Sequence, residues 1–277
     1  MDDDMELKGK VAIITGGASG IGSATCLKLA EEQVKAIGVV DQMDDVEDIC
    51  READHQAGRE LFIPFRGDVV DSSFREHVFA EMESRFGAVS LCVPAAGITR
   101  DRLCVKVYQN NGWVTPSIYS ETDFRRVADV DLLAPIYWAM RTVGSVAVDR
   151  AKRGLKEWSP EESVQGAIIL IGSISSAGNR GQISYATAKA GLVGAQGTLS
   201  KEAMYYGVRC AIIHPGFTDT PAVRALGEKI IQEQVLPNTQ LRRLIRPNEI
   251  AGAIVFMLKN SAVSGTLWAD AGWHPRA

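Results

Sequence analysis

The chain has 277 residues, a length that suits one α/β domain and is long enough to bury a sizeable core. Its 30 Lys and Arg against 34 Asp and Glu give a formal net charge of −4, and no basic patch stands out, which argues against a nucleic-acid partner. No run of 18 apolar residues predicts a membrane-spanning helix, and five scattered cysteines without a CxxC pair predict buried, reduced thiols in a cytoplasmic protein.

The chain begins with an acidic stretch, residues 1–8, that predicts a flexible tail; a single domain is expected over residues 9–277. Short β-rich apolar runs then alternate with segments of helical periodicity, which predicts a parallel sheet covered by helices on both faces. The expected strands are Val11–Thr15, Ile37–Val40, Leu61–Phe65, Val89–Val93, Ala167–Ile171, Val208–Ile213 and Thr266–Trp268. The expected helices are Ile21–Gln33, Ser72–Phe86, Thr122–Val148, Tyr185–Tyr206 and Pro247–Lys259.

Two stretches interrupt this alternation, one near 105–120 and one near 149–165. The first is polar and the second charged, so both predict inserted surface loops, the second with or without a short helical segment. Trp113, Tyr119 and Trp158 fall in these loops. Their aromatic rings either line the entrance of a site or pack the loops onto the domain, and the sequence leaves both interpretations open.

A glycine-rich turn, Thr15–Gly22, follows the first strand directly and opens the first helix. Glycines allow the backbone to turn tightly and to approach a pyrophosphate closely. The N-terminus of the following helix adds unpaired N–H groups and the positive end of its dipole. Strand, glycine turn and helix in this order predict a dinucleotide-binding site.

The second expected strand leads into Asp41. A carboxylate about 20 residues beyond the glycines can accept hydrogen bonds from the ribose hydroxyls of the dinucleotide and would repel a 2′-phosphate. The segment Gly16–Ile21 contains no Lys or Arg that would offset this repulsion. We therefore predict a preference for NAD(H) over NADP(H).

Tyr185 and Lys189 stand four residues apart at the start of an expected helix, so they share one helix face. A tyrosine with an ordinary pKa near 10 is a poor base at neutral pH, and a lysine ammonium one turn away favours its phenolate form. Ser173 follows the preceding expected strand after one glycine. Together with the glycine turn, this combination predicts proton transfer at a bound dinucleotide.

These motifs make the chain resemble the short-chain dehydrogenase/reductase family over nearly its whole length, and most closely the 3-oxoacyl-acyl-carrier-protein reductase branch. The resemblance is carried by TGGASGIG (Thr15–Gly22), Asp68-Val69, Ala95–Asp101, YATAK (Tyr185–Lys189), Pro215–Thr220 after His214, and Ser264-Gly265 to Asp270-Ala271-Gly272. It implies a single-domain Rossmann-type fold, a doubly wound parallel sheet of about seven strands with helices on both faces. It also implies a homotetramer built partly on the Thr122–Val148 and Tyr185–Tyr206 helices.

The resemblance implies hydride transfer between NAD(H) and a secondary alcohol or ketone, with Tyr185 as general acid and base. Ser173 would hydrogen-bond the substrate oxygen, and Lys189 would also hold the nicotinamide ribose. The implied cofactor-binding residues are Gly16, Ser19, Gly20, Ile21, Gly22, Asp41, Asp68, Val69, Ala96, Gly97, Tyr185, Lys189, Pro215, Gly216, Thr218 and Thr220. No metal is expected. Phe217 and a helix over Pro221–Glu233 would take the place of the family's mobile substrate lid.

Three departures from the family pattern bear on catalysis. Asp131 stands where the family has an asparagine, and if ionised it would oppose the effect of Lys189 on the tyrosine. Pro94-Ala95 replaces the two asparagines that usually follow the fourth strand. The interval from Ser173 to Tyr185 is one residue shorter than usual, which leaves Ser175 as a second candidate for the catalytic serine.

Two functions therefore remain open from the sequence. The first is an NAD-dependent oxidoreductase whose small-molecule substrate the sequence does not identify. The second is an NAD(H)-binding protein of the same fold with weak or no catalysis, acting as a sensor or scaffold, a reading motivated by Asp131 and by Pro94-Ala95. His214, beside Pro215 at an expected strand end, is given a structural role.

Overall fold

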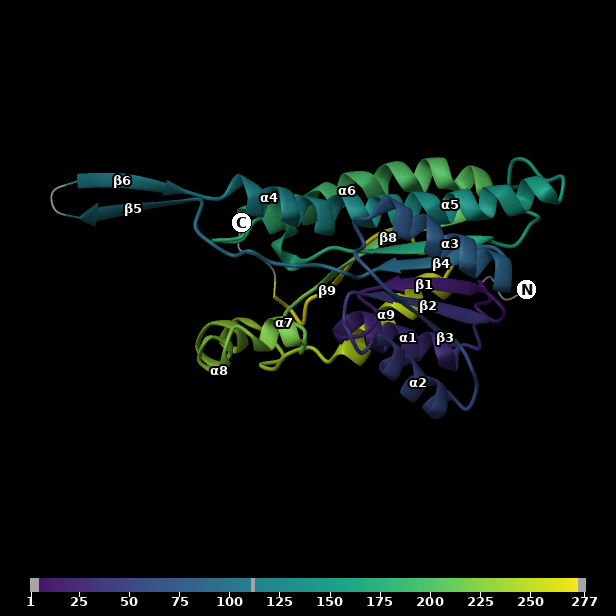
Figure 1. Ribbon diagram of the computed structural model, residues 1–277, viewed down its shortest axis with the longest axis horizontal. Helices are drawn as coiled ribbons and strands as arrows, with labels where there is room; N and C mark the ends of the chain where they lie inside the picture. The colour runs from purple at the N-terminus through teal and green to yellow at the C-terminus, as the bar shows by residue number, and fades with distance from the viewer. Residues whose placement is uncertain (1–4, 111–112, 274–277) are drawn as a thin grey trace.

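The computed structural model describes residues 5–110 and 113–273. Its centre is a seven-stranded sheet in the order β3-β2-β1-β4-β7-β8-β9, in which all neighbouring pairs are parallel (Figure 1). The strands are β1 (Val11–Thr15), β2 (Ala36–Asp41), β3 (Phe62–Arg66), β4 (Val89–Pro94), β7 (Gly166–Ile171), β8 (Val208–Pro215) and β9 (Gly265–Ala269). The predicted doubly wound fold is confirmed.

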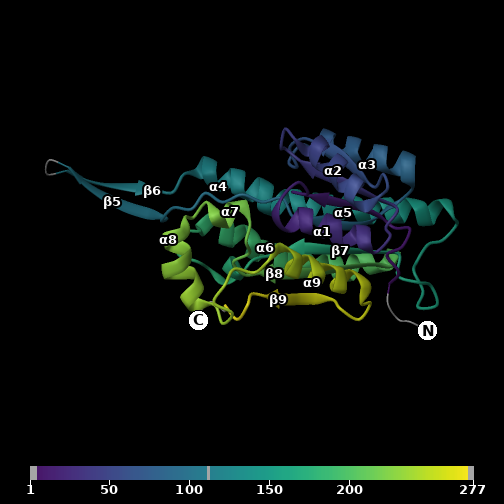
Figure 2. The ribbon, with the colours of Figure 1, turned by 90° about the horizontal axis from the view of Figure 1, so that it is seen from below.

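Helices cover both faces of this sheet (Figures 1 and 2). One face carries α1 (Gly20–Glu31), α2 (Val46–Ala57) and α9 (Pro247–Lys259). The other carries α3 (Ser72–Phe86), α4 (Glu121–Ala128), α5 (Ala134–Lys152) and α6 (Ile183–Glu202). Helix α2 was not among the predicted helices, because only two of its residues are buried and its apolar stripe is narrow.

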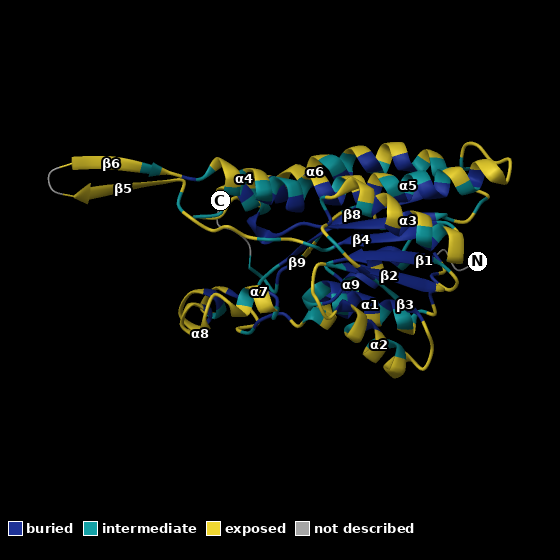
Figure 3. Cartoon of the chain, viewed as in Figure 1, coloured by how far each residue is buried: buried dark blue, intermediate teal, exposed yellow. Residues whose placement is uncertain are grey.

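The alternation of side chains along each strand supplies both cores. In β1, Ala12 and Ile14 pack with the α1–α9 layer, whereas Val11 and Ile13 pack with the α3–α5–α6 layer. All five residues of β1 are buried, as expected for a strand covered on both faces. The buried strands therefore lie in the middle of the molecule, and Figure 3 shows them in dark blue between the two helical layers.

The predicted flexible tail over residues 1–8 is wrong for the part that the structure describes. Met5 and Leu7 are buried in the core beside α9, and the Met5 amide donates a hydrogen bond to the Lys259 carbonyl. Two apolar side chains in an otherwise charged stretch are enough to dock the segment. Residues 1–4 lie outside the described residues.

The insertion near 105–120 forms a β-hairpin where a loop was predicted. Strands β5 (Val105–Asn110) and β6 (Trp113–Ile118) pair antiparallel and project from the domain as an arm (Figure 1). The alternation in Val105-Lys106-Val107 was the available strand signal, but it is short and the stretch is rich in the polar residues typical of a loop. Residues 111 and 112 at its end are outside the described part of the chain.

The insertion near 149–165 is an extension of α5 followed by a loop without a helix over residues 153–165. Buried Arg150 holds this loop through Glu162, with a distance of 2.6 Å from Nη1 to Oε2. Trp158 packs the loop against Gly207, and buried Tyr119 packs the base of the arm, whereas Trp113 is exposed. The aromatic residues of the two insertions therefore have different roles.

Two predicted helices are interrupted. The predicted Thr122–Val148 helix consists of α4 and α5 joined by a π-helical turn, Asp129–Leu133. The predicted Pro221–Glu233 helix is broken into α7 (Pro221–Arg224), α8 (Glu228–Ile230) and a π-helical turn, Ile231–Val235. Gly227, with a φ of +89°, separates α7 from α8, because a left-handed residue ends a right-handed helix.

Candidate active site

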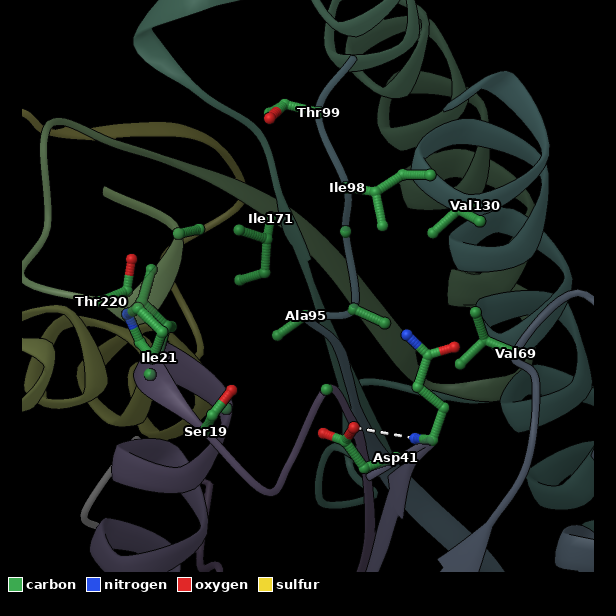
Figure 4. A pocket seen from close by; sticks show the side chains of 18 of the residues that line it. Ser19, Ile21, Asp41, Val69, Ala95, Ile98, Thr99, Val130, Ile171 and Thr220 are labelled. Atoms are coloured by element: carbon green, nitrogen blue, oxygen red, sulfur yellow. Dashed lines mark hydrogen bonds between the residues drawn. The ribbon is translucent and has the colours of Figure 1, made fainter. Parts of the chain in front are cut away.

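A cavity of about 450 Å³ opens at the carboxyl ends of the central strands. The strand order reverses between β1 and β4, and the loops that follow these two strands form much of the cavity wall. Such a switch point is where open α/β sheets bind their ligands. In Figure 4 the labelled side chains surround this space, with Asp41 at one end and Thr99 at the other.

The glycine turn is shaped for a close approach of backbone to ligand. Gly16 has a φ of +65°, and a Cβ on it would lie 2.8 Å from backbone atoms of Ala96. A Cβ on Gly22 would lie 2.1 Å from the Gly16 carbonyl oxygen. Ser19 precedes α1, and its side chain makes no capping hydrogen bond within the described chain. The first turn of α1 therefore faces the cavity with no side-chain cap at its N-terminus.

Asp41, at the end of β2, is tied to the glycine turn. Its Oδ2 accepts a hydrogen bond from the Ala18 amide at 3.1 Å, and its Oδ1 accepts one from the Gln42 amide at 2.8 Å. The Met43 amide also donates to Oδ1, at 3.3 Å. A carboxylate has about four lone-pair sites, so one remains for a further donor. Asp41 also lines the cavity and can accept hydrogen bonds from a ligand there.

Asp68 and Val69 form the neighbouring wall. The Asp68 carboxylate receives a hydrogen bond from Arg126 of α4 at 2.9 Å, and the carbonyl of Val69 receives one from the buried indole of Trp138 at 3.0 Å. Among the described residues that line the cavity, the cationic side chains are Arg126 and Lys189. Arg126 was not predicted, because nothing in the sequence of α4 places it beside Asp68.

Tyr185 and Lys189 lie on the face of α6 that lines the cavity. The Lys189 Nζ lies 5.5 Å from the centre of the Tyr185 ring and donates a hydrogen bond to the Ile171 carbonyl at 3.1 Å. Burial raises the pKa of Tyr185, as does the charge of Asp131, while Lys189 acts in the opposite direction. The tyrosine is therefore protonated at neutral pH in the isolated protein.

Ser173 reaches Tyr185 from the end of β7. The Ser173 side chain interacts with Tyr185 and acts to lower the pKa of the tyrosine, and the Ser173 Oγ accepts a hydrogen bond from the Ser175 amide at 3.0 Å. The Ser175 hydroxyl instead donates to Gln182 at 2.7 Å. Of the two serines, the geometry therefore places Ser173 beside the tyrosine.

His214 supports Ser173 from behind. Its Nδ1 lies 2.9 Å from the Ser173 carbonyl oxygen, and its ring stacks on Trp268 at 4.4 Å. A Cβ on Gly172 would lie 2.5 Å from the same Nδ1, so this close packing needs glycine there. Burial lowers the pKa of His214, which keeps the imidazole neutral. The structural role expected for His214 agrees with these contacts.

Asp131, in the π-helical turn between α4 and α5, is fully buried behind the cavity. One oxygen, Oδ2, accepts a hydrogen bond from the Ile98 amide at 3.1 Å. The other, Oδ1, lies 3.3 Å from Lys189 Nζ and has no hydrogen bond within the described chain. Burial raises the pKa of Asp131 against the opposing effect of Lys189. A Cβ on Gly97 would lie 2.6 Å from Oδ1, which explains glycine at that position.

The pKa of Lys189 is set by the same two effects, burial and the neighbouring charges, but here the neighbouring charges outweigh burial. Burial acts to lower the pKa of its ammonium, but Asp131 and Tyr185 together raise it. The lysine is therefore charged at neutral pH and is held between the tyrosine and a buried carboxylate.

The remaining predicted residues divide into two groups. Thirteen line the cavity, namely Gly16, Ser19, Gly20, Ile21, Gly22, Asp41, Asp68, Val69, Ala96, Gly97, Tyr185, Lys189 and Thr220. Five are not part of its lining, namely Asp131, Ser173, Pro215, Gly216 and Thr218. The last three lie at the end of β8 and just beyond it, where a Cβ on Gly216 would lie 2.7 Å from the Asp270 carbonyl oxygen. They shape the loop that carries Thr220.

The sequence analysis missed several lining residues besides Arg126. They are Gln42, Met43, Gly67, Ala95, Ile98, Thr99, Val130, Ile171, Pro221 and Ala222. Most of them are neighbours in the sequence of a predicted residue, and several directly follow the end of a strand. A position directly after an expected strand was therefore the signal that could have identified them. Within the described ranges, no group of three His, Cys, Asp or Glu side chains could hold a metal ion, and no helix is long and apolar enough to cross a membrane.

Comparison with known proteins assigns the family. Residues 10–231 match the short chain dehydrogenase family. The chain belongs to the short-chain dehydrogenase/reductase family. It is 31% identical over 276 residues to the 3-oxoacyl-acyl-carrier-protein reductase FabG of Escherichia coli, which covers 98% of this chain and 99% of that protein. It is 30% identical over 273 residues to an acetoacetyl-CoA reductase of Rhizobium meliloti, with coverages of 96% and 98%.

Solved structures confirm the short-chain dehydrogenase/reductase fold. A short-chain type dehydrogenase/reductase from Mycobacterium marinum is 22% identical and superposes with a TM-score of 0.80, over 97% of this chain and 96% of that one. A structure titled ribose-5-phosphate isomerase from Brucella melitensis is 24% identical, with a TM-score of 0.78 and coverages of 97% and 93%. At these identities the likeness shows the fold alone.

Members of this oxidoreductase family bind a nicotinamide cofactor, and the cavity fits one. The glycine turn suits a pyrophosphate, because its backbone at Gly16 and Gly22 has no room for a Cβ and the N-terminus of α1 beside it has no side-chain cap. The carboxylate of Asp41 at the end of β2 suits a ribose. The family resemblance derived from the motifs is therefore confirmed, and so is the general reaction class.

Proposed function

We propose that this protein is an NAD(H)-dependent enzyme that interconverts a ketone and a secondary alcohol. The observation that carries the proposal is the meeting of Ser173, Tyr185 and Lys189 beside the cavity that the glycine turn forms. A bound nicotinamide supplies or accepts a hydride at the carbon of the substrate. The protein contributes the position of that carbon and the proton on its oxygen.

Tyr185 and Ser173 carry out the proton chemistry. The Ser173 side chain interacts with Tyr185, so a carbonyl oxygen placed beside both hydroxyls would accept a hydrogen bond from each. The raised pKa of Tyr185 keeps its proton available at neutral pH, which suits the tyrosine as a general acid in ketone reduction. The Lys189 ammonium then stabilises the phenolate that remains.

Asp41 supports the preference for NAD(H). It accepts hydrogen bonds from three backbone amides, which fix its carboxylate at the cavity wall. An arginine can accommodate a 2′-phosphate. Among the described residues that line the cavity the arginine is Arg126, and its guanidinium is already paired with Asp68. A 2′-phosphate beside Asp41 would thus meet a fixed negative charge, whereas ribose hydroxyls would donate to it.

The cofactor prediction is tested by measuring Kd for NADH and NADPH with the wild type and with Asp41→Ala. We expect NADH to bind more tightly to the wild type, and the variant to lose most of this preference through improved NADPH binding. Asp45→Ala, an exposed aspartate close by, is the matched control. Tighter binding of NADPH to the wild type would overturn the assignment.

The activity is tested by absorbance at 340 nm against 3-oxoacyl thioesters, other ketones, sugars and sterols, and the matching alcohols. The names of the relatives favour 3-oxoacyl thioesters as the first substrates to try. Tyr185→Phe should reduce kcat by about 10²–10⁴-fold, the usual contribution of general acid–base catalysis, and retain NADH binding. A rate unchanged in Tyr185→Phe would remove the tyrosine from the mechanism.

A second function, nucleotide binding without efficient catalysis, is supported by the Asp131–Lys189 pair. A buried carboxylate 3.3 Å from the ammonium weakens the effect of that ammonium on the tyrosine. Tight NADH binding with no turnover on the whole substrate panel would favour this function. Turnover that depends on Tyr185 would exclude it.

The oligomer and the compartment also belong to the proposal. Helix α5 carries an exposed apolar stripe at helical spacing, formed by Leu133 just before it and by Tyr137, Met140 and Val148. We assign this face, together with that of α6, to the subunit interface of a homotetramer.

The cysteines support a cytoplasmic location. Five unpaired cysteines, of which Cys104 is exposed, fit a reducing cytoplasm.

A further inference from the structure

The β5–β6 arm exposes an apolar surface that nothing in the described part of the chain covers. In Figure 3 the arm is almost entirely exposed and stands away from both helical layers. Val107 is 66% exposed and Ile118 is 72% exposed. An isolated two-stranded hairpin is marginally stable in water, so an arm of this kind is stabilised by a surface on which it packs.

The pairing register separates the arm into two faces of different character. Paired residues of an antiparallel ladder lie on the same face, and successive residues alternate between the faces. One face therefore holds Val105 with Ile118, Val107 with Pro116, and Gln109 with Val114, so five of its six residues are apolar. The opposite face holds Lys106 with Ser117, Tyr108 with Thr115, and Asn110 with Trp113. We call the first of these the apolar face of the arm.

The base of the arm is fixed to the body of the protein. The Tyr119 hydroxyl donates to the Arg100 carbonyl at 2.7 Å and lies 2.8 Å from the Ser184 Oγ. The Arg102 amide donates to the Gly181 carbonyl at 2.8 Å. These bonds anchor both ends of the hairpin to the loop before α6 and to its first turn. The arm consequently has a defined direction, as a docking element requires.

We propose that the apolar face of the arm packs on a second copy of this chain, in an exchange in which each copy gives one arm and receives one. Six residues per strand and two strands give a face of roughly 20 Å by 10 Å. Two arms and the two surfaces that receive them bury on the order of 1,000 Å² in total, the area at which a specific interface becomes stable. A partner that received a single arm would bury only half of that.

The charge of the chain favours a second copy over a lipid surface as the occupant. The arm carries one basic residue, Lys106, and the chain has a formal net charge of −4, which an anionic membrane would repel. The far end of the described arm is mixed, because polar Gln109 and Asn110 pair with exposed Val114 and Trp113. Reciprocal exchange is also the usual closed arrangement of a homodimer.

The test is sedimentation equilibrium of the full chain over a wide range of concentration. The double variant Val107→Ser with Ile118→Ser removes apolar surface from the apolar face. The matched control, Tyr108→Ser with Trp113→Ser, removes two larger exposed side chains from the opposite face of the same two strands. We expect the first variant to sediment at half the mass of the wild type, with Kd raised by about tenfold or more. The control should keep the wild-type mass.

Three outcomes would overturn the proposal. The first is a wild-type protein that is monomeric at all concentrations. The second is that both variants keep the mass of the wild type. The third is that both variants lose mass to the same extent. Binding of the monomeric wild type to vesicles of phosphatidylcholine and phosphatidylserine would assign the arm to a membrane instead. Thermal unfolding by circular dichroism establishes that both variants keep the folded body. A variant that does not fold is replaced by Val114→Ser, which removes one side chain from the same face.

Discussion

At the residue scale, Asp131 is the position at which this chain departs most clearly from its family pattern. Its carboxylate lies 3.3 Å from the Lys189 ammonium and accepts a hydrogen bond from the Ile98 amide, so it links Lys189 to the backbone of the cavity wall. Glycine at position 97 leaves the space that this carboxylate needs. The sequence indicated a negative charge near Lys189, but the fold was needed to show a direct ion pair.

The Asp131→Asn variant tests how this pair tunes the tyrosine. The charge of Asp131 raises the pKa of Tyr185, so its removal should lower that pKa. Alcohol oxidation needs the phenolate, and its ascending pH limb should therefore move to lower pH, with a severalfold gain in rate at neutral pH. Ketone reduction needs the protonated tyrosine and should lose activity at alkaline pH sooner than the wild type does.

The matched control is Asp129→Asn, a less buried aspartate in the same π-helical turn, which should leave both profiles unchanged. Rates of oxidation and reduction against pH, with NADH binding measured in parallel, separate this effect from misfolding. Profiles that coincide with those of the wild type would show that Asp131 has no influence on the tyrosine.

At the element scale, the inner strands of the sheet were predictable because each is a short apolar run buried on both faces. Elements with one exposed face were harder. Helix α2 has two buried residues, and the β5–β6 arm has none, so neither shows the pattern that a core enforces. Gly227 breaks the predicted lid helix, although its position alone does not reveal a φ of +89°.

The N-terminal segment provides a test at this scale. Leu7 is 2% exposed, so Leu7→Ala should reduce the free energy of unfolding by about 2–5 kcal/mol, the usual cost of such a cavity. The exposed neighbour Lys8, changed to Ala, should alter it by no more than about 0.5 kcal/mol. Urea denaturation measures both values. If Leu7→Ala and the wild type had equal free energies of unfolding, residues 5–8 would belong to a flexible tail, as the sequence predicted.

At the scale of the whole molecule, burial separates the cysteines into two classes. Cys104 is exposed, and the other four are buried. Burial raises the pKa of Cys92 to about 12, and it does the same for Cys210. A thiol reagent should therefore modify one cysteine in the native protein and five after denaturation, and Cys104→Ser should abolish the native reaction.

The same raised pKa values predict how stability depends on alkaline pH. An unfolded cysteine has a pKa near 9.0, so above that pH the unfolded chain loses these protons before the folded chain does. The contribution of Cys92 and Cys210 is fully present below pH 9 and is lost as the pH rises toward about 12. Urea denaturation from pH 7 to 11 should show this decline, and Cys92→Ala with Cys210→Ala should show less of it. An equal decline in this variant would assign the loss to other groups.

The sequence by itself determined the class of sheet, the place of the glycine turn, and the chemistry of Tyr185 and Lys189, because these depend on residues that are close together in the chain. The tertiary structure alone decided which groups from distant segments meet. The order of the parallel strands brings four such groups to the cavity wall or directly behind it: Arg126 on α4 lines the cavity, and Ser173 after β7, His214 on β8 and Asp131 in a π-helical turn lie behind the wall. Sequence spacing does not encode these distances, since packing of the two helical layers on the sheet sets them.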